Sequence, residues 1–175
     1  SSGLINTVTD ALGRVTDYDY NSKEQVSHIT FALGTVDQAQ QQFEYDEAGN
    51  LAAIIDENGN RTEYDYDDRN RVIQIIEADP DGTGPLTSPM VGFGYDEAGN
   101  LTRFTDARDH ETEYTYDEKH RLIEVLDAAG NRTQYAYDDA SNLVSILDGN
   151  GHETRYEYDS RDRRTAMIDA EGYRT

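Results

Sequence analysis

The sequence predicts an all-β protein in which tandem β-hairpin repeats form a curved or spiralling antiparallel sheet. Aromatic residues recur in pairs two positions apart, turn-forming residues recur at fixed distances after each pair, and short apolar runs lie between the turns. Residues two positions apart point to one face of a strand, so each aromatic pair marks one strand. A lone hairpin is marginal in water, so we expect each repeat to pair with the next and the long sheet to twist.

The second aromatic residue of each pair is always tyrosine and sets the register of the repeat. Successive register tyrosines are 25, 21, 29, 21, 21 and 21 residues apart. An aspartate follows each of them except the first, where Asn21 stands. The aromatic pairs that we expect to define the repeat are Tyr18 and Tyr20, Phe43 and Tyr45, Tyr64 and Tyr66, Phe93 and Tyr95, Tyr114 and Tyr116, Tyr135 and Tyr137, and Tyr156 and Tyr158.

Each repeat contains two predicted turns, and both need a residue with a positive φ. Gly, Asn, His and Asp tolerate that conformation best, and hairpin loops of four or five residues require it. Four residues after the register tyrosine lie Glu24, Gly49, Asn70, Gly99, His120, Ser141 and Asp162. Fourteen residues after it lie Gly59, Asp109, Gly130, Gly151 and Gly172. We expect Gly49, Gly59, Gly99, Gly130 and Gly151 to define the repeat together with the aromatic pairs.

A short apolar strand returns after the first turn of each repeat. These return strands are predicted to begin at Val26, Leu51, Val72, Leu101, Leu122, Leu143 and Arg164. A four-residue loop after Asp138 pairs Tyr137 with Val144. In the same register Tyr135 pairs with Ile146. This places aromatic and β-branched side chains on one face, where each pair contributes roughly 0.2–1 kcal/mol.

The chain reads as a single array of repeats excerpted from a longer protein. A partial repeat at 5–16 precedes repeats at roughly 17–42, 43–62, 63–92, 93–112, 113–133, 134–154 and 155–175. The first full repeat has four extra residues, and its polar run at 37–42 is predicted to be a lengthened loop. The third has eight extra residues at 79–90, with all three prolines of the chain, and is predicted to leave the sheet there as an inserted loop.

Composition argues against several classes of protein. The net charge of −21 repels nucleic acid and anionic membranes, so we expect neither as a partner. No apolar run approaches the ~20 residues of a membrane helix, so no membrane span is predicted. A hydrophobic content of 35% would suit a disordered chain, but disordered acidic chains lack 13 regularly spaced tyrosines. Without cysteine the chain has no disulfide framework.

These residues resemble the YD repeats of the Rhs family, which also includes the C subunits of insecticidal toxin complexes and the teneurins. The tracts that carry the resemblance are YDEAGNL at Tyr45–Leu51 and Tyr95–Leu101, LDAAGNRTQYAYD at Leu126–Asp138 and IDENGNRTEYDYD at Ile55–Asp67. It covers the chain from about residue 5 to residue 175. The resemblance implies an arc of a hollow shell, a non-catalytic structural segment that encapsulates a C-terminal toxin polypeptide and helps to deliver it.

The same resemblance implies partners and a location. The partners are the remainder of the same shell and the enclosed toxin polypeptide, with secretion machinery or surface glycans as further candidates. The location is secreted or at the cell surface, as part of a larger protein. In several relatives a self-cleaving segment with a Pro-rich signature follows the repeats. The tract Asp79-Pro80-Asp81-Gly82 is similar, but it lacks the leucine of that signature and lies between repeats, so we interpret it as a loop.

No catalytic, metal or cofactor site is predicted. His110 and His152 occupy a turn position where Asn60 and Asn131 also occur, and interchangeable polar turn residues carry no chemistry. Acids recur at equivalent positions in every repeat, which indicates a solvated surface and not a glycosidase pair. Calcium binding by the Asp-x-x-Gly-Asn turns stays open, although their spacing differs from an EF-hand.

Two other functions remain as alternatives. A cell-surface carbohydrate-binding or adhesion module would use the rows of tyrosines as an aromatic platform for sugars. An enzyme, either a self-cleaving protease or a glycosidase, would need singular residues that break the repetition.

Overall fold

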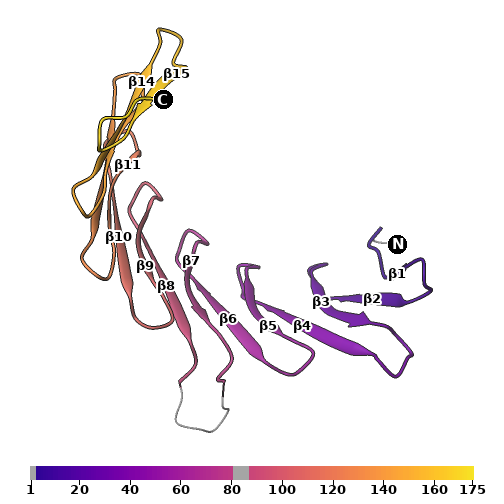
Figure 1. Cartoon of the computed structure of the whole chain (residues 1–175). Helices are drawn as coiled ribbons and strands as arrows, with labels where there is room; N and C mark the ends of the chain where they lie inside the picture. Colours follow the sequence, from indigo (N-terminus) through magenta and orange to yellow (C-terminus); the bar gives the residue numbers. More distant parts are fainter. Residues whose placement is uncertain (1–2, 81–86) are drawn as a thin grey trace. The chain divides into compact units, whose positions relative to one another are not determined.

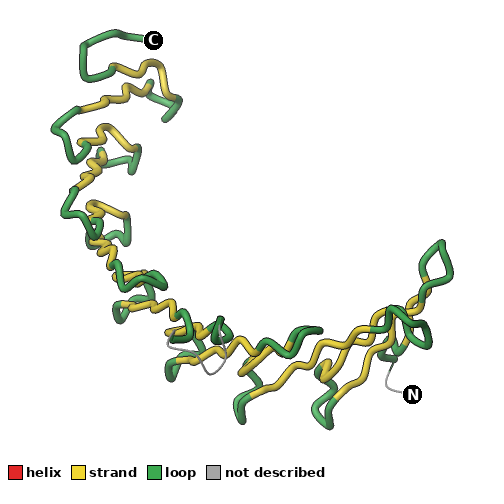
Figure 2. The backbone as a smooth tube through the Cα atoms, turned by 60° about the horizontal axis from the view of Figure 1, so that its bottom comes forward, coloured by secondary structure: helices red, strands yellow, loops and turns green. Residues whose placement is uncertain are grey.

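The structure is a computed structural model and describes residues 3–80 and 87–175. The described residues form fifteen strands and no helix, and the strands lie in sequence order in one open antiparallel sheet (Figures 1 and 2). The predicted all-β class and the succession of hairpins are therefore confirmed, whereas the curvature of the sheet stays a prediction. Because the described part of the chain lacks helices, it contains none that could cross a bilayer.

The return strands begin at the seven residues predicted for them. The strands are β1 (Thr7–Thr9), β2 (Val15–Tyr20), β3 (Val26–Phe31), β4 (Ala39–Tyr45), β5 (Leu51–Ile55), β6 (Arg61–Tyr66), β7 (Val72–Ile76), β8 (Met90–Tyr95), β9 (Leu101–Thr105), β10 (Glu111–Tyr116), β11 (Leu122–Leu126), β12 (Arg132–Tyr137), β13 (Leu143–Leu147), β14 (Glu153–Tyr158) and β15 (Arg164–Ile168).

The chain divides into an N-terminal half, residues 1–91, and a C-terminal half, residues 92–175. Within each half every described strand packs only against the strands beside it in the sheet. The stability of each half is therefore a sum of terms for single repeats and for neighbouring pairs.

The first turn of each repeat is a hairpin loop of three residues. In the repeat at 134–154, the Asp138 N–H donates to the Asn142 carbonyl at 3.0 Å, and the Ser141 N–H donates to the Asp138 carbonyl at 3.0 Å. Ser141 has φ of 72°. This is the hairpin in which a tight turn is followed by one left-handed residue. The predicted loop of four or five residues is wrong by at least one residue.

A β-bulge follows each of these turns and restores the predicted face of the sheet. Tyr135 faces Ile146 as predicted, but Tyr137 faces Leu143, and the predicted partner Val144 is the extra residue of the bulge. Without that extra residue, the three-residue loop would bring Ser145 opposite Tyr135. The same shift occurs in all seven hairpins of the described residues.

All the positions predicted to need a left-handed backbone have a positive φ. Values run from 57° at Asp162 to 98° at Gly99 in the first turn, and from 60° at Asp109 to 87° at Gly172 in the second. The strain of a side chain in this conformation is local. The positions of left-handed residues can therefore be predicted from the sequence of each turn alone.

The lengthened loop of the first full repeat lies earlier than predicted. Residues 32–38 form the loop, while Ala39–Tyr45 form β4, so Gln40, Gln41 and Gln42 of the predicted loop belong to the sheet. Two of their amides are bonded: Gln40 Nε2 donates to Thr30 Oγ1 on β3 at 3.1 Å, and Gln41 Nε2 donates to Glu57 Oε1 in the turn after β5 at 2.9 Å. A polar strand is stable at this place because its side chains bond across the ladder.

The inserted loop predicted at 79–90 is described only in part. The Glu77 N–H donates to the Pro89 carbonyl at 2.9 Å, which closes the base of the insertion, and β8 begins at Met90. Residues 81–86, which include half of the tract Asp79–Gly82, lie outside the described residues.

The sheet is a single layer with almost no buried core. Among the described residues only Ala53, Ala166 and Thr30 are buried, and most other strand side chains are half-exposed. From β10 to β14 the side chains that share the tyrosines' face are uncharged, whereas the opposite face carries glutamates and arginines. In β15 Arg164 is a charged exception, with its guanidinium 5.6 Å from the ring centre of Tyr156.

Candidate functional site

The aspartate that follows the register tyrosine caps its own turn. Asp138 Oδ1 accepts the Asn142 N–H at 2.8 Å, and Asp138 Oδ2 accepts the Asn142 side-chain amide at 3.0 Å. The same carboxylate-to-fourth-residue bonds recur in the other first turns at Asp46, Asp67, Asp96, Asp117 and Asp159. They recur in the second turns at Asp10, Asp56, Asp106, Asp127 and Asp148. We call these residues the capping aspartates.

Hydrogen bonds hold the pKa of the capping aspartates below the ordinary range. At Asp138 the amide side chain of Asn142 is the largest cause of the lowered pKa, followed by the Asn142 backbone N–H. At Asp117 the Arg121 backbone N–H comes first and the Arg121 side chain second. Donors that bond the charged carboxylate favour it over the protonated form. The sequence signal for this cap is an Asp followed four residues later by Asn, Arg or His; the sequence analysis considered the Asp-x-x-Gly-Asn turns as possible calcium ligands and did not predict the cap.

The turn histidines belong to the same caps. The His110 and His152 backbone N–H groups donate to Asp106 and Asp148 at 2.9 and 2.8 Å, and each ring Nδ1 lies 3.1 and 3.2 Å from the same carboxylate. Their place is therefore the turn position predicted for them. The described residues contain no group of three or more His, Cys, Asp or Glu side chains that could hold a metal ion.

At least five of the seven register tyrosines donate a hydrogen bond to the segment that precedes their repeat. The Tyr137 hydroxyl donates to the Leu122 carbonyl at 2.9 Å, and the Tyr158 hydroxyl donates to the Leu143 carbonyl at 2.9 Å. The acceptor is the first residue of the preceding return strand in these repeats. Two further bonds follow this pattern in the N-terminal half, from Tyr45 to Val26 and from Tyr66 to Leu51, and Tyr20 donates to Ile5, which precedes β1.

Burial between strands raises the pKa of several register tyrosines. Desolvation is the largest cause at Tyr66, Tyr116 and Tyr137, because the protein around the hydroxyl solvates a phenolate poorly. At Tyr137 the neighbouring Arg121 acts in the opposite direction. The neutral hydroxyl is the form that can donate the bond to the preceding strand.

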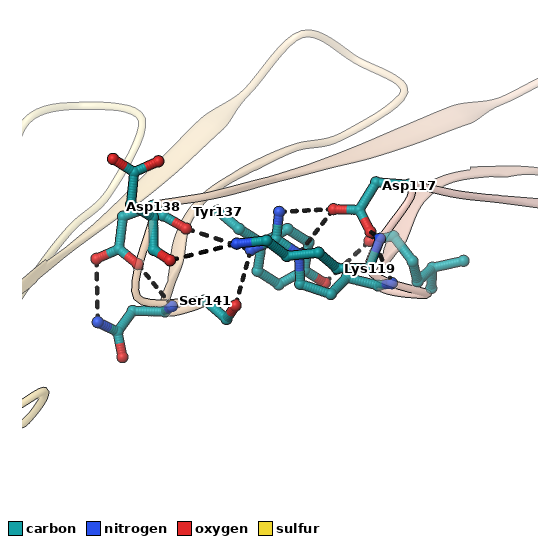
Figure 3. A network of polar contacts seen from close by, with 9 residues as sticks. Asp117, Lys119, Tyr137, Asp138 and Ser141 are labelled. Carbon is teal, nitrogen blue, oxygen red and sulfur yellow. Dashed lines mark hydrogen bonds and ion pairs between the residues drawn. The ribbon is translucent and has the colours of Figure 1, made fainter.

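Arg121 connects two successive first turns, and Figure 3 labels its partners Asp117, Asp138 and Ser141. Within its own turn it donates from Nε to Asp117 Oδ2 at 2.7 Å. Its Nη1 reaches the next turn, where it donates to the Asp138 carbonyl at 3.2 Å and to Ser141 Oγ at 3.1 Å. Its guanidinium carbon lies 4.6 Å from the ring centre of Tyr137.

Lys119 supports the same connection. Its ammonium donates to the carbonyl of Asp139 in the next turn at 3.4 Å, beside the contacts of Arg121 (Figure 3). The sequence analysis missed both residues, because it considered the pairing of strands between repeats and not the contacts between successive turns.

In the N-terminal half, an ionic group surrounds Ala53 on the face opposite to the tyrosines. Ala53 faces Glu44 on one neighbouring strand and Glu63 on the other. Arg61 reaches both glutamates, at 2.8 Å to Glu44 and 2.7 Å to Glu63. The alkyl stem of an arginine can cover apolar surface while its head stays bonded, and Ala53 has 0% of its surface exposed. Repeated acids are thus partly paired, and not all simply solvated as predicted.

The comparisons with known proteins give a consistent result for fold and family. The Teneurin YD-shell family profile matches residues 3–174. No curated protein sequence matches the chain significantly. A crystal structure of the TcdB2–TccC3–Cdc42 complex is similar with a TM-score of 0.70 and 19% identity over 87% of this chain. The Photorhabdus luminescens Tc holotoxin pore is similar with a TM-score of 0.69 and 19% identity over 88% of this chain.

The chain spans 9% of the length of each of these solved chains. Identities near one fifth show a shared fold, whereas the family match extends over almost the entire sequence. The hairpins, the paired aromatics and the capped turns are therefore those of a YD-repeat array, and the chain belongs to the Teneurin YD-shell family.

Proposed function

We propose that this chain is a non-catalytic wall segment of a YD shell that encloses a toxin polypeptide and helps to deliver it. The single-layer sheet carries this proposal. Of the described residues only three are buried, so the array has no core of its own to build a closed globular domain. A layer one sheet thick, with bonded repeats and two open faces, suits a partition between two spaces.

The two faces support a partition because they differ in chemistry. In the C-terminal half Thr133 and Tyr135 belong to the uncharged face of β12, while Arg132 and Gln134 on the opposite face bond Glu124 at 3.1 and 3.0 Å. An uncharged aromatic face can lie against an unfolded polypeptide without leaving buried charges. Under this proposal the aromatic pairs and turn glycines define the repeat and hold the partition together.

The same proposal gives the partners and the location. The partners are the rest of the shell and the enclosed polypeptide, and the shell is secreted or displayed at a cell surface as part of a larger protein. The Tc complexes with similar structures support this assignment by fold and family.

Limited proteolysis of the longer protein that contains this chain tests the proposal. We expect an unfolded polypeptide segment to survive protease while the shell is intact and to be digested once the shell is opened with urea. The control is the same segment expressed alone, which should be digested at once. Equal digestion of all segments before and after opening would contradict enclosure.

A carbohydrate-binding module is the second candidate, because the aromatic face also suits sugar stacking. Isothermal titration against an array of glycans separates the two. Specific binding at the tyrosine face, lost on Tyr135→Ala and retained on Gln134→Ala, would favour adhesion over enclosure.

A further inference from the structure

The last residue of the first turn alternates between two kinds along the array. After the first full repeat the residues at this position are Asn50, Arg71, Asn100, Arg121, Asn142 and Arg163. We call the boundary between a return strand and the next repeat a junction, and name each junction by this residue. The C-terminal half contains an Arg121 junction at β11–β12, between an Asn100 junction at β9–β10 and an Asn142 junction at β13–β14.

At the Arg121 junction, the planar guanidinium of Arg121 donates several hydrogen bonds that connect the two turns. Arg121 bonds Asp117 in its own turn and both the Asp138 carbonyl and Ser141 Oγ in the next, and it lies over Tyr137. Its side chain is 22% exposed, whereas that of Arg163, which has no following repeat in this chain, is 70% exposed. The difference shows that the following repeat covers the arginine.

The Asn junctions are tied more weakly. Asn142 Nδ2 bonds Asp138 Oδ2 in its own turn at 3.0 Å and reaches the next turn at Asp162 Oδ1, at 2.9 Å. Asn100 Nδ2 likewise lies 3.1 Å from His120 Nδ1 in the next turn. Neither amide carries a charge, and an amide is too short to lie over a ring as Arg121 does.

The strand ladder and the tyrosine bond are the same at the Arg121 and Asn142 junctions. Three residue pairs form the ladder at each, Glu124–Leu126 with Arg132–Gln134 and Ser145–Leu147 with Glu153–Arg155. Both also have the tyrosine bond to the preceding strand. The Arg121 junction has further contacts of its own: Arg132 and Gln134 bond Glu124 on the opposite face, and Lys119 bonds the Asp139 carbonyl in the next turn.

We propose that the array is built from pairs of repeats, in which an Arg junction holds two repeats as one cooperative block and the Asn junctions are seams where the sheet opens first. The repeats at 113–133 and 134–154 form one such block, and the seams lie at β9–β10 and β13–β14. This inference goes beyond the enclosing role, because it concerns how the wall opens whether or not anything is enclosed.

Hydrogen exchange of the whole chain tests the seams. Amides of β12 that bond β11 should exchange about tenfold or more slowly than those of β14 that bond β13, because Arg121 makes two charge-assisted bonds and a cation–π contact with the next repeat, whereas Asn142 makes one bond, to the Asp162 carboxylate. Equal protection at the two junctions, or faster exchange at the Arg121 junction, would overturn the proposal.

Exchanging the two side chains isolates their contribution. Arg121→Asn should raise β12 exchange most of the way to the β14 level without changing β14, because the contacts of Arg132, Gln134 and Lys119 remain. Arg121→Lys should give most of this increase because lysine lacks the fork. Asn142→Arg should slow β14 exchange about tenfold, since the new guanidinium can reach the Asp159 carbonyl and Asp162. None of these variants touches Arg132, so an unchanged β12–β14 difference in all three would overturn the assignment to Arg121.

Discussion

The Tyr45 hydroxyl donates to the carbonyl of Val26, nineteen residues before it in the chain. In the regular repeats the same bond spans fifteen residues, as between Tyr137 and Leu122. The difference of four equals the number of extra residues in the first full repeat. The insertion is therefore absorbed in the loop at 32–38, and the bond between repeats is preserved.

Removal of one such hydroxyl should weaken a single boundary between repeats. We expect Tyr137→Phe to lower the free energy of unfolding by about 0.5–1.5 kcal/mol, because the half-buried Leu122 carbonyl loses its donor while the ring remains. Urea unfolding followed by circular dichroism measures the change. Tyr135→Phe is the control, since the described role of Tyr135 is to face Ile146 with its ring. Equal losses in both variants would contradict the role of the hydroxyl.

A larger side chain at Ala53 should disrupt the ionic cover above it. Ala53 has none of its surface exposed, and Arg61 bonds glutamates on both sides of it. We expect Ala53→Leu to cost about 1–3 kcal/mol through overpacking. Ala136→Leu, at an exposed position of β12, should change the free energy of unfolding by less than about 0.5 kcal/mol. The prediction fails if the two variants unfold at the same urea concentration.

Gly130 tests backbone strain without steric clash. Its φ is 82°, and a β-carbon added there would meet no atom within 4 Å. Gly130→Ala should therefore cost about 1–2 kcal/mol from conformation alone. Gly130→Asn should cost clearly less, because asparagine tolerates the left-handed region. If both substitutions are neutral in thermal unfolding, the second turn does not require its left-handed residue.

Acid should destabilise the array in a defined pH window. The capping aspartates have a lowered pKa in the folded chain, so their contribution is complete above the unfolded-state pKa, near 3.9. It is lost as the pH falls from about 4 through the lowered folded pKa. The urea midpoint should hence decrease as the pH falls below about 4. A midpoint that stays constant or rises across this range would contradict the caps.

The sequence predicted the strands more accurately than the contacts between repeats. Return strands and left-handed turn residues were correct because each depends on local chemistry, as at Leu143 and Ser141. The predicted partner of Tyr137 was wrong because the loop is shorter than predicted and the bulge adds the missing residue to the strand. The periodicity of the sequence reports only the combined length of the loop and the bulge.

The roles of Arg121 and Arg61 could not be predicted from a single repeat. Arg121 acts on the turn of the following repeat, and Arg61 joins strands on either side of β5. Both contacts depend on the spacing between strands in three dimensions, and the repeat pattern reports only what successive segments have in common.

Because each described strand touches only the strands beside it within its half, the array has no fixed size at which it becomes complete. A duplicated segment of 21 residues contains its own capped turns, its own bulge and a tyrosine that can donate to the return strand before it. Growth by tandem duplication of the gene therefore needs no redesign elsewhere, and evolution can lengthen such a sheet one hairpin at a time.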